Sequence, residues 1–344
     1  MSPHLRVGLV GLGMMGRHHA RVLRALDGVD LIAVADPAGD PYSVVDDLEV
    51  QRDVGALIAQ DIDVCVVAAP TALHLEVGLA LAQAGVHTLI EKPLATDVSE
   101  AQQLLAAFRT AGVLGCVGHI ERYNPSLLAL RERLDAGELG DVYQVATRRQ
   151  GPFPNRIADV GVVMDLATHD IDLTAWVTRQ KYEFVSAYTA HKSGRRHEDL
   201  ISVSGELTDG TVVNHLVNWL SPLKERTTVV TGERGAFVAD TLHADLTFYE
   251  NGLVPTQWDT IATFRGVVEG NMTRFAIPKP EPLAVELAAF RDAINGLNGA
   301  DIVTLEEGLE TVAVGRACIE SARRNRVQRL SDPHVRRVDN RGRL

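Results

Sequence analysis

Short apolar runs alternate with helix-like segments over the first third of the chain. Five of these runs are continuous rather than alternating in hydrophobicity, which is typical of strands buried on both faces of a parallel sheet. The predicted strands are Leu5–Val10, Leu31–Ala35, Val64–Ala69, His87–Ile90 and Leu114–Val117. The helices predicted between them are Met15–Leu26, a shorter segment around Asp53–Gln60, Ala72–Ala84 and Ser99–Ala111. This order predicts a doubly wound α/β domain, in which ligands bind at the carboxyl ends of the strands.

The pattern changes after Pro125. Between Glu183 and Glu250, strand-like runs are separated by short turn signals, which indicate a mainly antiparallel sheet. The other elements predicted here are helices over Ser126–Ala136, Leu283–Asn295 and Leu305–Asn325, a strand over Val142–Gln150 and a helix that begins near Val163. Antiparallel strands flanked by helices form an α+β domain.

The length of 344 residues suits two domains better than one. We expect the doubly wound domain at residues 1–121 and a second domain at 122–330, with C-terminal helices that pack back on the first domain. Apolar periodicity stops near Leu330, so residues 331–344 are predicted to be a disordered tail.

Composition narrows the range of partners. A formal net charge of −11 gives no basis for binding nucleic acid or a membrane surface. No apolar run approaches the length of a membrane span, and the first strand begins too early to leave room for a signal peptide, so we predict a cytoplasmic protein. Cys65, Cys116 and Cys318 lie in apolar segments without metal-ligand spacing, which predicts buried free thiols and no metal site.

The first candidate site is the sequence Gly-Leu-Gly-Met-Met-Gly, which ends the first strand and opens the first helix. Gly11 would permit a tight turn, Gly13 would let the backbone approach a pyrophosphate, and Gly16 would let the helix pack closely on the strand. The amides at the start of the helix, among them those of Met14 and Met15, would bind the anion. A strand-turn-helix without a ligand is the alternative.

Asp36 ends the second predicted strand, twenty residues after Gly16. An acidic side chain at this spacing accepts hydrogen bonds from the adenosine ribose hydroxyls, and its charge repels a 2′-phosphate. The pattern therefore predicts a dinucleotide site that prefers NAD to NADP.

The triplet Glu91-Lys92-Pro93 follows the fourth predicted strand, which places Lys92 at a carboxyl end of the sheet. A lysine there can hydrogen-bond a substrate hydroxyl or carbonyl and can tune neighbouring pKa values. Pro93 would fix the local backbone, for which a cis bond is one route. Taken alone, the triplet is more typical of a surface lysine in a loop.

Asp165 and His169 stand four residues apart in a predicted helix, where they would share a face. Oxidising an alcohol requires removal of the hydroxyl proton, and histidine is the usual base for that step. The carboxylate one turn away would orient the imidazole or bind a second hydroxyl. The alternative is a helix N-terminus whose acidic residues favour the dipole, with His169 a satisfied core group.

A polar cluster follows the fifth predicted strand. It contains His119, Arg122, Tyr123 and Asn124, more polar groups than a simple connector needs. Amides, imidazoles and hydroxyls of this kind match several hydroxyls of a sugar. Two roles stay open for His119: contact with the nicotinamide ribose, or capping of the helix that begins near Ser126.

Together these motifs resemble the glucose–fructose oxidoreductase/inositol dehydrogenase/MocA (Gfo/Idh/MocA) family. The resemblance extends to about Leu330 and implies a Rossmann domain followed by a domain with an open-faced, mainly antiparallel sheet, whose open face makes a dimer or tetramer interface. It rests on the glycine loop, Asp36, Ala69-Pro70-Thr71 with His74, Glu91-Lys92-Pro93, and Asp165 to His169.

The same resemblance implies roles for individual residues. It implies that Lys92, Asp165 and His169 are the catalytic group, with His169 or Lys92 handling the proton. The cofactor implied is NAD, with contacts at Pro70, Thr71, His74, Glu91, Lys92 and His119 in addition to the glycine loop and Asp36. The expected substrate-binding residues are Lys92, Arg122, Tyr123, Asn124, Arg149, Arg156, Asp165 and His169.

Within the family, Gly118–Pro125 and Arg149–Arg156 look most like UDP-N-acetylglucosamine 3-dehydrogenase-type members, which oxidise the 3-hydroxyl of a nucleotide-linked amino sugar. Guanidinium groups match phosphate oxygens, so Arg148, Arg149 and Arg156 are candidates for binding a substrate diphosphate; solvated strand and loop charges are the alternative. For the whole chain the alternatives are a ketoreductase of a nucleotide-linked keto-sugar, a dehydrogenase of a free cyclitol or monosaccharide, and a nucleotide-sensing regulatory protein without enzymatic activity.

Overall fold

The computed structural model describes residues 4–45, 47–154, 160–252, 268–297 and 299–330, and its chain forms two compact units. The first unit contains the described residues within 1–120 and 281–316, and the second those within 121–280 and 317–335. The chain thus enters the second unit one residue before the division predicted between residues 121 and 122, and it returns to the first unit at Glu281. The tail predicted at 331–344 lies outside the described residues.

The first unit is built on a parallel sheet of six strands in the order β3-β2-β1-β4-β5-β6. The strands are β1 (Leu5–Val10), β2 (Val29–Ala35), β3 (Val50–Gln51), β4 (Val64–Val67), β5 (His87–Glu91) and β6 (Gly115–Gly118). The five predicted strands are confirmed, whereas β3 has only two residues and too little pattern to be found. The strand order reverses between β1 and β4, and ligands of doubly wound sheets bind at this point, beyond the carboxyl ends of the strands.

The helices between these strands begin and end at recognisable signals. Helix α4, for example, begins after Asp97, whose side chain accepts a hydrogen bond from the amide of Glu100, and it ends at Gly112 in the left-handed conformation. The helical elements of this unit are α1 (Met14–Ala25), α2 (Val54–Ile58), η1 (Thr71–Leu73), α3 (His74–Gln83), α4 (Val98–Ala111), α8 (Pro282–Ile294) and the first part of α9 (Leu305–Arg324).

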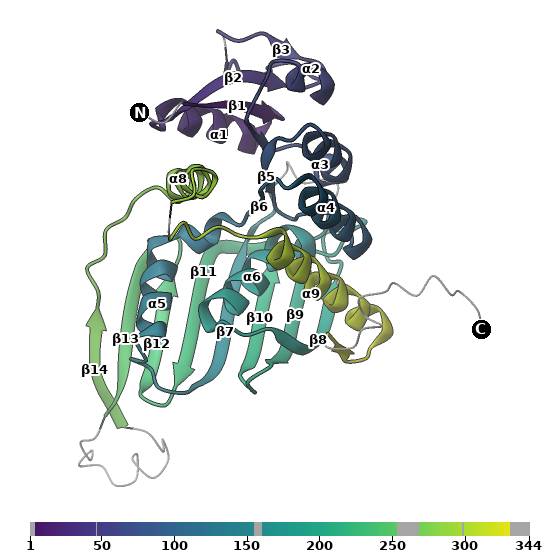
Figure 1. Ribbon diagram of the computed structural model, residues 1–344. Coiled ribbons are helices and arrows are strands. Elements are labelled where there is room, and N and C mark those ends of the chain that lie inside the picture. Colours follow the sequence, from purple (N-terminus) through teal and green to yellow (C-terminus); the bar gives the residue numbers. More distant parts are fainter. Residues whose placement is uncertain (1–3, 46, 155–159, 253–267, 298, 331–344) are drawn as a thin grey trace. The chain divides into compact units, whose positions relative to one another are not determined.

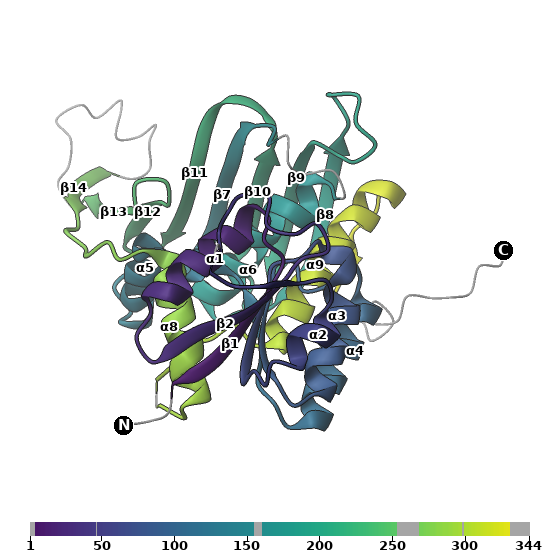
Figure 2. The same ribbon diagram turned by 90° about the horizontal axis from the view of Figure 1, so that it is seen from above.

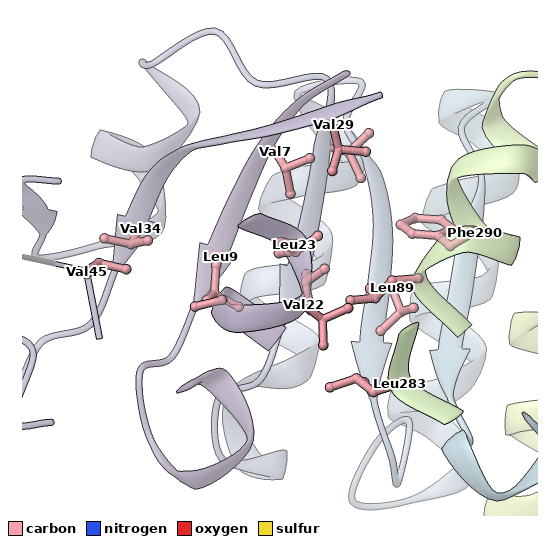
Figure 3. Close-up of a cluster of buried hydrophobic side chains, with 14 of the residues drawn as sticks. Val7, Leu9, Val22, Leu23, Val29, Val34, Val45, Leu89, Leu283 and Phe290 are labelled. Carbon is pink, nitrogen blue, oxygen red and sulfur yellow. The ribbon is translucent and has the colours of Figure 1, made fainter. Parts of the chain in front are cut away.

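Helix α8 belongs to the core of the first unit although it is about 160 residues from β6 in the sequence. Its residues Leu283, Leu287 and Phe290 recur at helical spacing and pack in one apolar cluster with Leu9 and Leu89 (Figure 3). Burying one such side chain contributes about 1.5–3 kcal/mol, so α8 stabilises the sheet that carries the glycine loop.

The second unit contains a sheet of nine strands in the order β14-β13-β12-β11-β7-β10-β9-β8-β15. Its neighbouring strands are antiparallel except for the parallel pair β7 and β10, so the predicted mainly antiparallel sheet is confirmed. The strands are β7 (Val142–Pro152), β8 (Tyr182–Ala190), β9 (Leu200–Leu207), β10 (Val212–Asn218), β11 (Leu220–Gly232), β12 (Gly235–Asp240), β13 (Asp245–Gly252), β14 (Val268–Arg274) and β15 (Gln328–Arg329).

One face of this sheet is covered by α5 (Pro125–Asp135), α6 (Thr168–Thr178) and the end of α9, while no described helix of this unit covers the other face (Figures 1 and 2). Side chains alternate accordingly: Val145 and Arg149 of β7 are buried on the helix side. On the other face a polar row crosses three strands, since Gln144 donates to Asn214 and Asn214 donates to Ser204.

Cys65, Cys116 and Cys318 are buried free thiols, as predicted. Among the described residues no helix combines the length and the hydropathy needed to span a membrane.

Candidate active site

The three glycines of the loop after β1 differ in the space around their Cβ positions. Gly11 has φ +92°, and a Cβ there would lie 2.7 Å from the carbonyl oxygen of Ala68. A Cβ on Gly16 would overlap the carbonyl oxygen of Gly11, so α1 can pack closely on the loop only without a side chain. A Cβ on Gly13 would meet nothing within 4 Å. The loop is therefore closed around Gly11 and Gly16 and open above Gly13, where a pyrophosphate would approach.

Helix α1 begins directly at this open position. Gly13 is its N-cap and provides no side-chain hydrogen bond. The first amides of an α-helix have no partner within the helix, so those of Met14 and Met15 remain donors for an anion. The geometry of the loop and the helix start fits the pyrophosphate of a dinucleotide.

The Asp36 carboxylate is held at the end of β2 by two backbone amides. Its Oδ2 accepts a hydrogen bond from the amide of Leu12 at 2.8 Å, and its Oδ1 accepts one from the amide of Ala38 at 2.8 Å. These bonds fix the carboxylate beside the glycine loop and leave lone pairs for further donors, since each carboxylate oxygen can accept two bonds. The site thus fits the ribose hydroxyls of NAD.

Pro70, Thr71 and His74 lie in the connection from β4 to α3. Pro70 caps η1, Thr71 is its buried first residue, and His74 begins α3. The His74 ring joins two loops, because Nε2 lies 3.0 Å from the carbonyl oxygen of Ala69 and Nδ1 lies 3.0 Å from that of Pro93. Burial lowers the pKa of His74, which favours the neutral ring, and a neutral ring has a single N–H that donates to only one of these two carbonyls. It therefore braces the predicted cofactor loops through the backbone.

Glu91 and Lys92 stand at the carboxyl end of β5. Glu91 is buried, and its Oε1 lies 2.7 Å from Nε2 of His19 on α1. Its Oε2 accepts a hydrogen bond from the amide of Lys92 at 3.2 Å. Lys92 is half-buried, and the peptide bond from Lys92 to Pro93 is cis. Sequence analysis did not identify His19, which is 72 residues away from Glu91 and has no motif of its own.

His119 follows β6 and is buried, with its amide bonded to the carbonyl of Val117 at 2.9 Å. The alternative that it caps the next helix was wrong. The N-cap of α5 is Asn124, whose side chain accepts from the amide of Ser126 and donates to the carbonyl of Thr241 at 3.0 Å. Asn124, predicted to bind substrate, thus uses both ends of its amide in the second unit.

The two described arginines predicted to bind substrate form buried ion pairs in the second unit. Arg122 donates two hydrogen bonds to Asp172, at 2.8 and 2.6 Å. Arg149 is 3% exposed, and it donates to Asp170 at 2.8 Å and to Glu121 at 2.9 Å. Burial alone would lower the pKa of Arg149, but the charges of Asp170 and Glu121 raise it. Both guanidinium groups therefore hold elements of this unit together. Arg156 lies outside the described residues, and Tyr123 is buried in η2 (Ile120–Tyr123).

Asp165 and His169 lie on consecutive turns of a helix that changes its winding between them. Residues Val163–Ala167 form a π-helical turn, and α6 begins at Thr168. The predicted helix is thus present, and its winding between Asp165 and His169 departs from a regular α-helix because the π turn is one residue wider. Single π turns of this kind occur frequently at functional sites. Both side chains are buried, at 5% and 9% exposure.

The turn before this helix is shaped by a glycine. A Cβ on Gly161 would overlap the carboxylate of Glu198, which accepts a hydrogen bond from the amide of Val163 at 3.2 Å. The amide of Asp165 in turn donates to the carbonyl of Gly161 at 3.1 Å. Gly161 and Glu198 thus set the start of the segment that carries Asp165.

Sequence analysis also missed Arg226 on β11. Its side chain is 32% exposed and its Nη1 lies 3.3 Å from Oε1 of Glu121. Burial and the nearby Arg149 lower the pKa of Arg226, while Glu121, Asp170 and Asp165 raise it. Arg226 is thus the more exposed cation of the cluster around Asp165, and its strand carries no motif that would have identified it.

Two domains of one family match the chain. The family described as "Oxidoreductase family, NAD-binding Rossmann fold" matches residues 5–119. The "GFO/IDH/MocA C-terminal domain" matches residues 127–238.

Relatives with assigned activities have moderate identity. UDP-N-acetylglucosamine 3-dehydrogenase of Acidithiobacillus ferrooxidans is 33% identical over 61% of this chain and 66% of its own length. Inositol 2-dehydrogenase 2 of Saccharopolyspora erythraea is 30% identical over 57% of this chain and 60% of its own length. The chain thus matches less than two thirds of the length of either relative.

Solved structures align over nearly the whole chain. The UDP-N-acetylglucosamine 3-dehydrogenase GnnA from Acidithiobacillus ferrooxidans has a TM-score of 0.79 and 27% identity, and the alignment covers 92% of this chain and 97% of that one. GenD2 from gentamicin A biosynthesis, in complex with NAD, has a TM-score of 0.79 and 26% identity, with coverage of 96% and 97%. The chain therefore belongs to the GFO/IDH/MocA family of oxidoreductases, and its first unit is an NAD-binding Rossmann domain.

Proposed function

We propose that this protein is an NAD-dependent dehydrogenase that oxidises a ring secondary alcohol of a sugar, with the 3-hydroxyl of UDP-N-acetylglucosamine or a related nucleotide sugar as substrate. The observation that carries the proposal is the glycine loop with Asp36, which fits NAD, together with Lys92 at the carboxyl end of β5. The choice of sugar is supported by the activity of the Acidithiobacillus relative.

The proposed mechanism assigns one role to each catalytic side chain. When bound, NAD accepts the hydride that leaves the sugar carbon. His169 takes the hydroxyl proton as general base, and Asp165 orients the imidazole. Lys92 donates a hydrogen bond to the oxygen as negative charge develops on it. The reacting oxygen becomes the carbonyl oxygen of a ketone, and the proton remains on His169 until solvent takes it.

We propose that Arg122 and Arg149 do not bind the substrate, in contrast to the prediction from the motifs. Arg122 and Arg149 are occupied by Asp172, Asp170 and Glu121, so we assign them to positioning. Arg226 keeps an exposed part of its guanidinium group and is our candidate for a polar or anionic group of the substrate.

The test is a panel of substrates with NAD, in which NADH formation is measured with UDP-N-acetylglucosamine, other UDP-hexosamines and free inositols. We expect turnover with a UDP-hexosamine and a loss of roughly 100- to 10,000-fold in kcat for Lys92→Ala and His169→Ala, with NAD affinity retained. Lys181→Ala and His191→Ala remove exposed side chains of the same types and serve as controls. Full activity of both active-site variants would refute the assignment.

A free cyclitol is the second candidate substrate. It is favoured by the inositol dehydrogenases among the relatives, including inositol 2-dehydrogenase 2 of Saccharopolyspora erythraea. Turnover of myo- or scyllo-inositol without turnover of any UDP-sugar would select this function.

We also propose that the protein forms a homodimer or homotetramer through the face of the nine-stranded sheet that lacks helices. The polar row from Gln144 to Ser204 and the exposed ring of Tyr188 lie in strands of this sheet. Light scattering on the purified protein tests this proposal, and a monomer at all concentrations would contradict it.

A further inference from the structure

The side chain of Glu91 is held from two sides within the first unit. Oε1 receives the hydrogen bond from His19 on α1, and Oε2 receives the one from the amide of Lys92. A Cβ on Gly118, at the end of β6, would lie 3.2 Å from Cδ of Glu91, so the glycine leaves room that a side chain there would crowd. Burial would raise the pKa of Glu91, but the bond from His19 and the charge of Lys92 lower it. Glu91 is therefore a buried carboxylate with a donor on each oxygen.

Helix α8 brings a second carboxyl group into the same core. Glu286 is 1% exposed, and neither of its oxygens has a hydrogen-bond partner among the residues that the structure describes. It is three residues from Leu283 and four from Phe290, and all three are buried, so Glu286 shares the core-facing side of α8 with them. Burying the carboxyl group of Glu286 without a hydrogen-bond partner therefore costs free energy of folding, most of all if the group is charged.

The ionisable groups around Glu286 come from three elements. Glu91 on β5 acts on it directly, and Cys116 on β6 lies within its electrostatic range. His19 on α1 and Lys92 act on Glu91. His19 and the amide of Lys92 are the two donors identified here, and both bond Glu91.

We propose that Glu286 is a positioning residue for Lys92: it remains uncharged, fills the buried space beside Glu91, and so leaves the Glu91 carboxylate to hold His19 and the Lys92 amide. The inference rests on the proposed function only for the catalytic role of Lys92. Two neighbouring buried carboxyl groups cannot both ionise without strong repulsion, and the group with no donor keeps the proton. Burial and the charge of Glu91 raise the pKa of Glu286 well above its usual range.

The proton on Glu286 has a consequence for stability. In the unfolded chain Glu286 loses its proton at the ordinary pKa, whereas in the folded protein it keeps the proton to higher pH. The folded state then binds more protons than the unfolded state, so stability falls as pH rises above the unfolded pKa. Glu286→Gln, which has the shape of the protonated acid and no proton to lose, escapes this loss.

Thermal unfolding of the full chain from about pH 5 to about pH 9 tests this directly. We expect the melting temperature of Glu286→Gln to be close to that of the wild type at the acidic end. As pH rises, it should exceed the wild-type value by an increasing margin. Glu286→Leu, an apolar replacement of similar size, should show the same trend if the amide variant folds poorly. Glu76→Gln removes an exposed glutamate of the same unit, and its melting temperature should differ from that of the wild type by the same amount at every pH. A constant difference for both Glu286 variants would overturn the proposal.

The positioning role requires a second measurement. If Glu286 ionises as pH rises, its charge repels Glu91 and loosens the Lys92 turn. NADH affinity and kcat of the wild type should then fall together on the alkaline side, and Glu286→Gln should lack this fall. An alkaline limb that is unchanged in Glu286→Gln would overturn the role, even if the melting data agree. NADH titration and melting need no sugar, so they remain informative if no sugar is oxidised and the proposed function fails.

Discussion

The amide of Leu12, inside the glycine loop, donates a hydrogen bond to Oδ2 of Asp36 at the end of β2. This bond links the residue that we propose selects the cofactor to the loop that we propose binds its pyrophosphate. A carboxylate in this position can accept from ribose hydroxyls and repels a 2′-phosphate. We therefore expect the connection between β1 and β2 to set a preference for NAD.

Asp36→Ala should weaken NADH binding by about 10- to 100-fold, because hydrogen bonds to a charged group contribute about 1.5–3 kcal/mol. NADPH binding should weaken less or improve, since the repulsive charge is gone. Fluorescence titration with both cofactors measures the ratio. Asp30→Ala, at an exposed position of the same strand, is the control. An unchanged ratio of NADH to NADPH affinity would exclude Asp36 from cofactor selection.

The three glycines should separate into two groups when each is replaced by alanine. Gly11→Ala and Gly16→Ala should destabilise the protein by roughly 1–3 kcal/mol, because Gly11 needs a positive φ and both approach backbone closely. Gly13→Ala should cost at most about 1 kcal/mol, since open space surrounds its Cβ position. Its effect should instead be a loss of NAD affinity. Urea unfolding and NADH titration of the three variants measure both properties, and a stable Gly13→Ala that binds NADH normally would contradict the assignment.

Replacing Arg149 tests whether this side chain positions other residues or binds substrate. Arg149→Met leaves the buried carboxylates of Glu121 and Asp170 without their shared cation, which typically costs about 3–5 kcal/mol. Urea unfolding should show this loss. Arg148→Met removes the neighbouring arginine, whose side chain is 56% exposed, and should cost less than about 1 kcal/mol. If Arg149 bound a substrate diphosphate instead, its variant would fold normally and raise KM.

The sequence predicted the elements whose pattern is local. The continuous apolar runs identified the parallel strands because both faces of that sheet are buried, and the glycine spacing identified the loop because Gly11 and Gly16 leave no room for a Cβ. The partners of Arg149 were not predictable, since Glu121 and Asp170 are 28 and 21 residues away and only packing brings them together. Glu286 was missed for the same reason, because no motif marks a buried carboxyl group.

A last prediction concerns the buried chain of hydrogen bonds that reaches α6. The hydroxyl of Thr147 lies 2.8 Å from Nδ1 of His215, and Nε2 of His215 lies 2.8 Å from the hydroxyl of Tyr182. The Tyr182 hydroxyl donates onward to the carbonyl of Ile171 at 3.4 Å. A neutral His215 with its proton on Nε2 satisfies every donor in this chain. Burial lowers the pKa of His215 to about 4, even though Asp170 acts to raise it.

Acidification should therefore destabilise the protein through His215. Between the unfolded pKa of about 6.5 and the folded value of about 4, the unfolded state binds more protons, so the free energy of unfolding falls as pH is lowered. From pH 7 to pH 5 the loss from this residue is about 2 kcal/mol. His215→Gln has no such proton uptake and should lose about 2 kcal/mol less than the wild type over the same interval, whatever its stability at pH 7. Urea unfolding at the two pH values measures the difference, with the exposed His191→Gln as the matched control. Equal losses in wild type and His215→Gln would show that His215 has the same pKa in the folded and unfolded states, which would contradict the prediction.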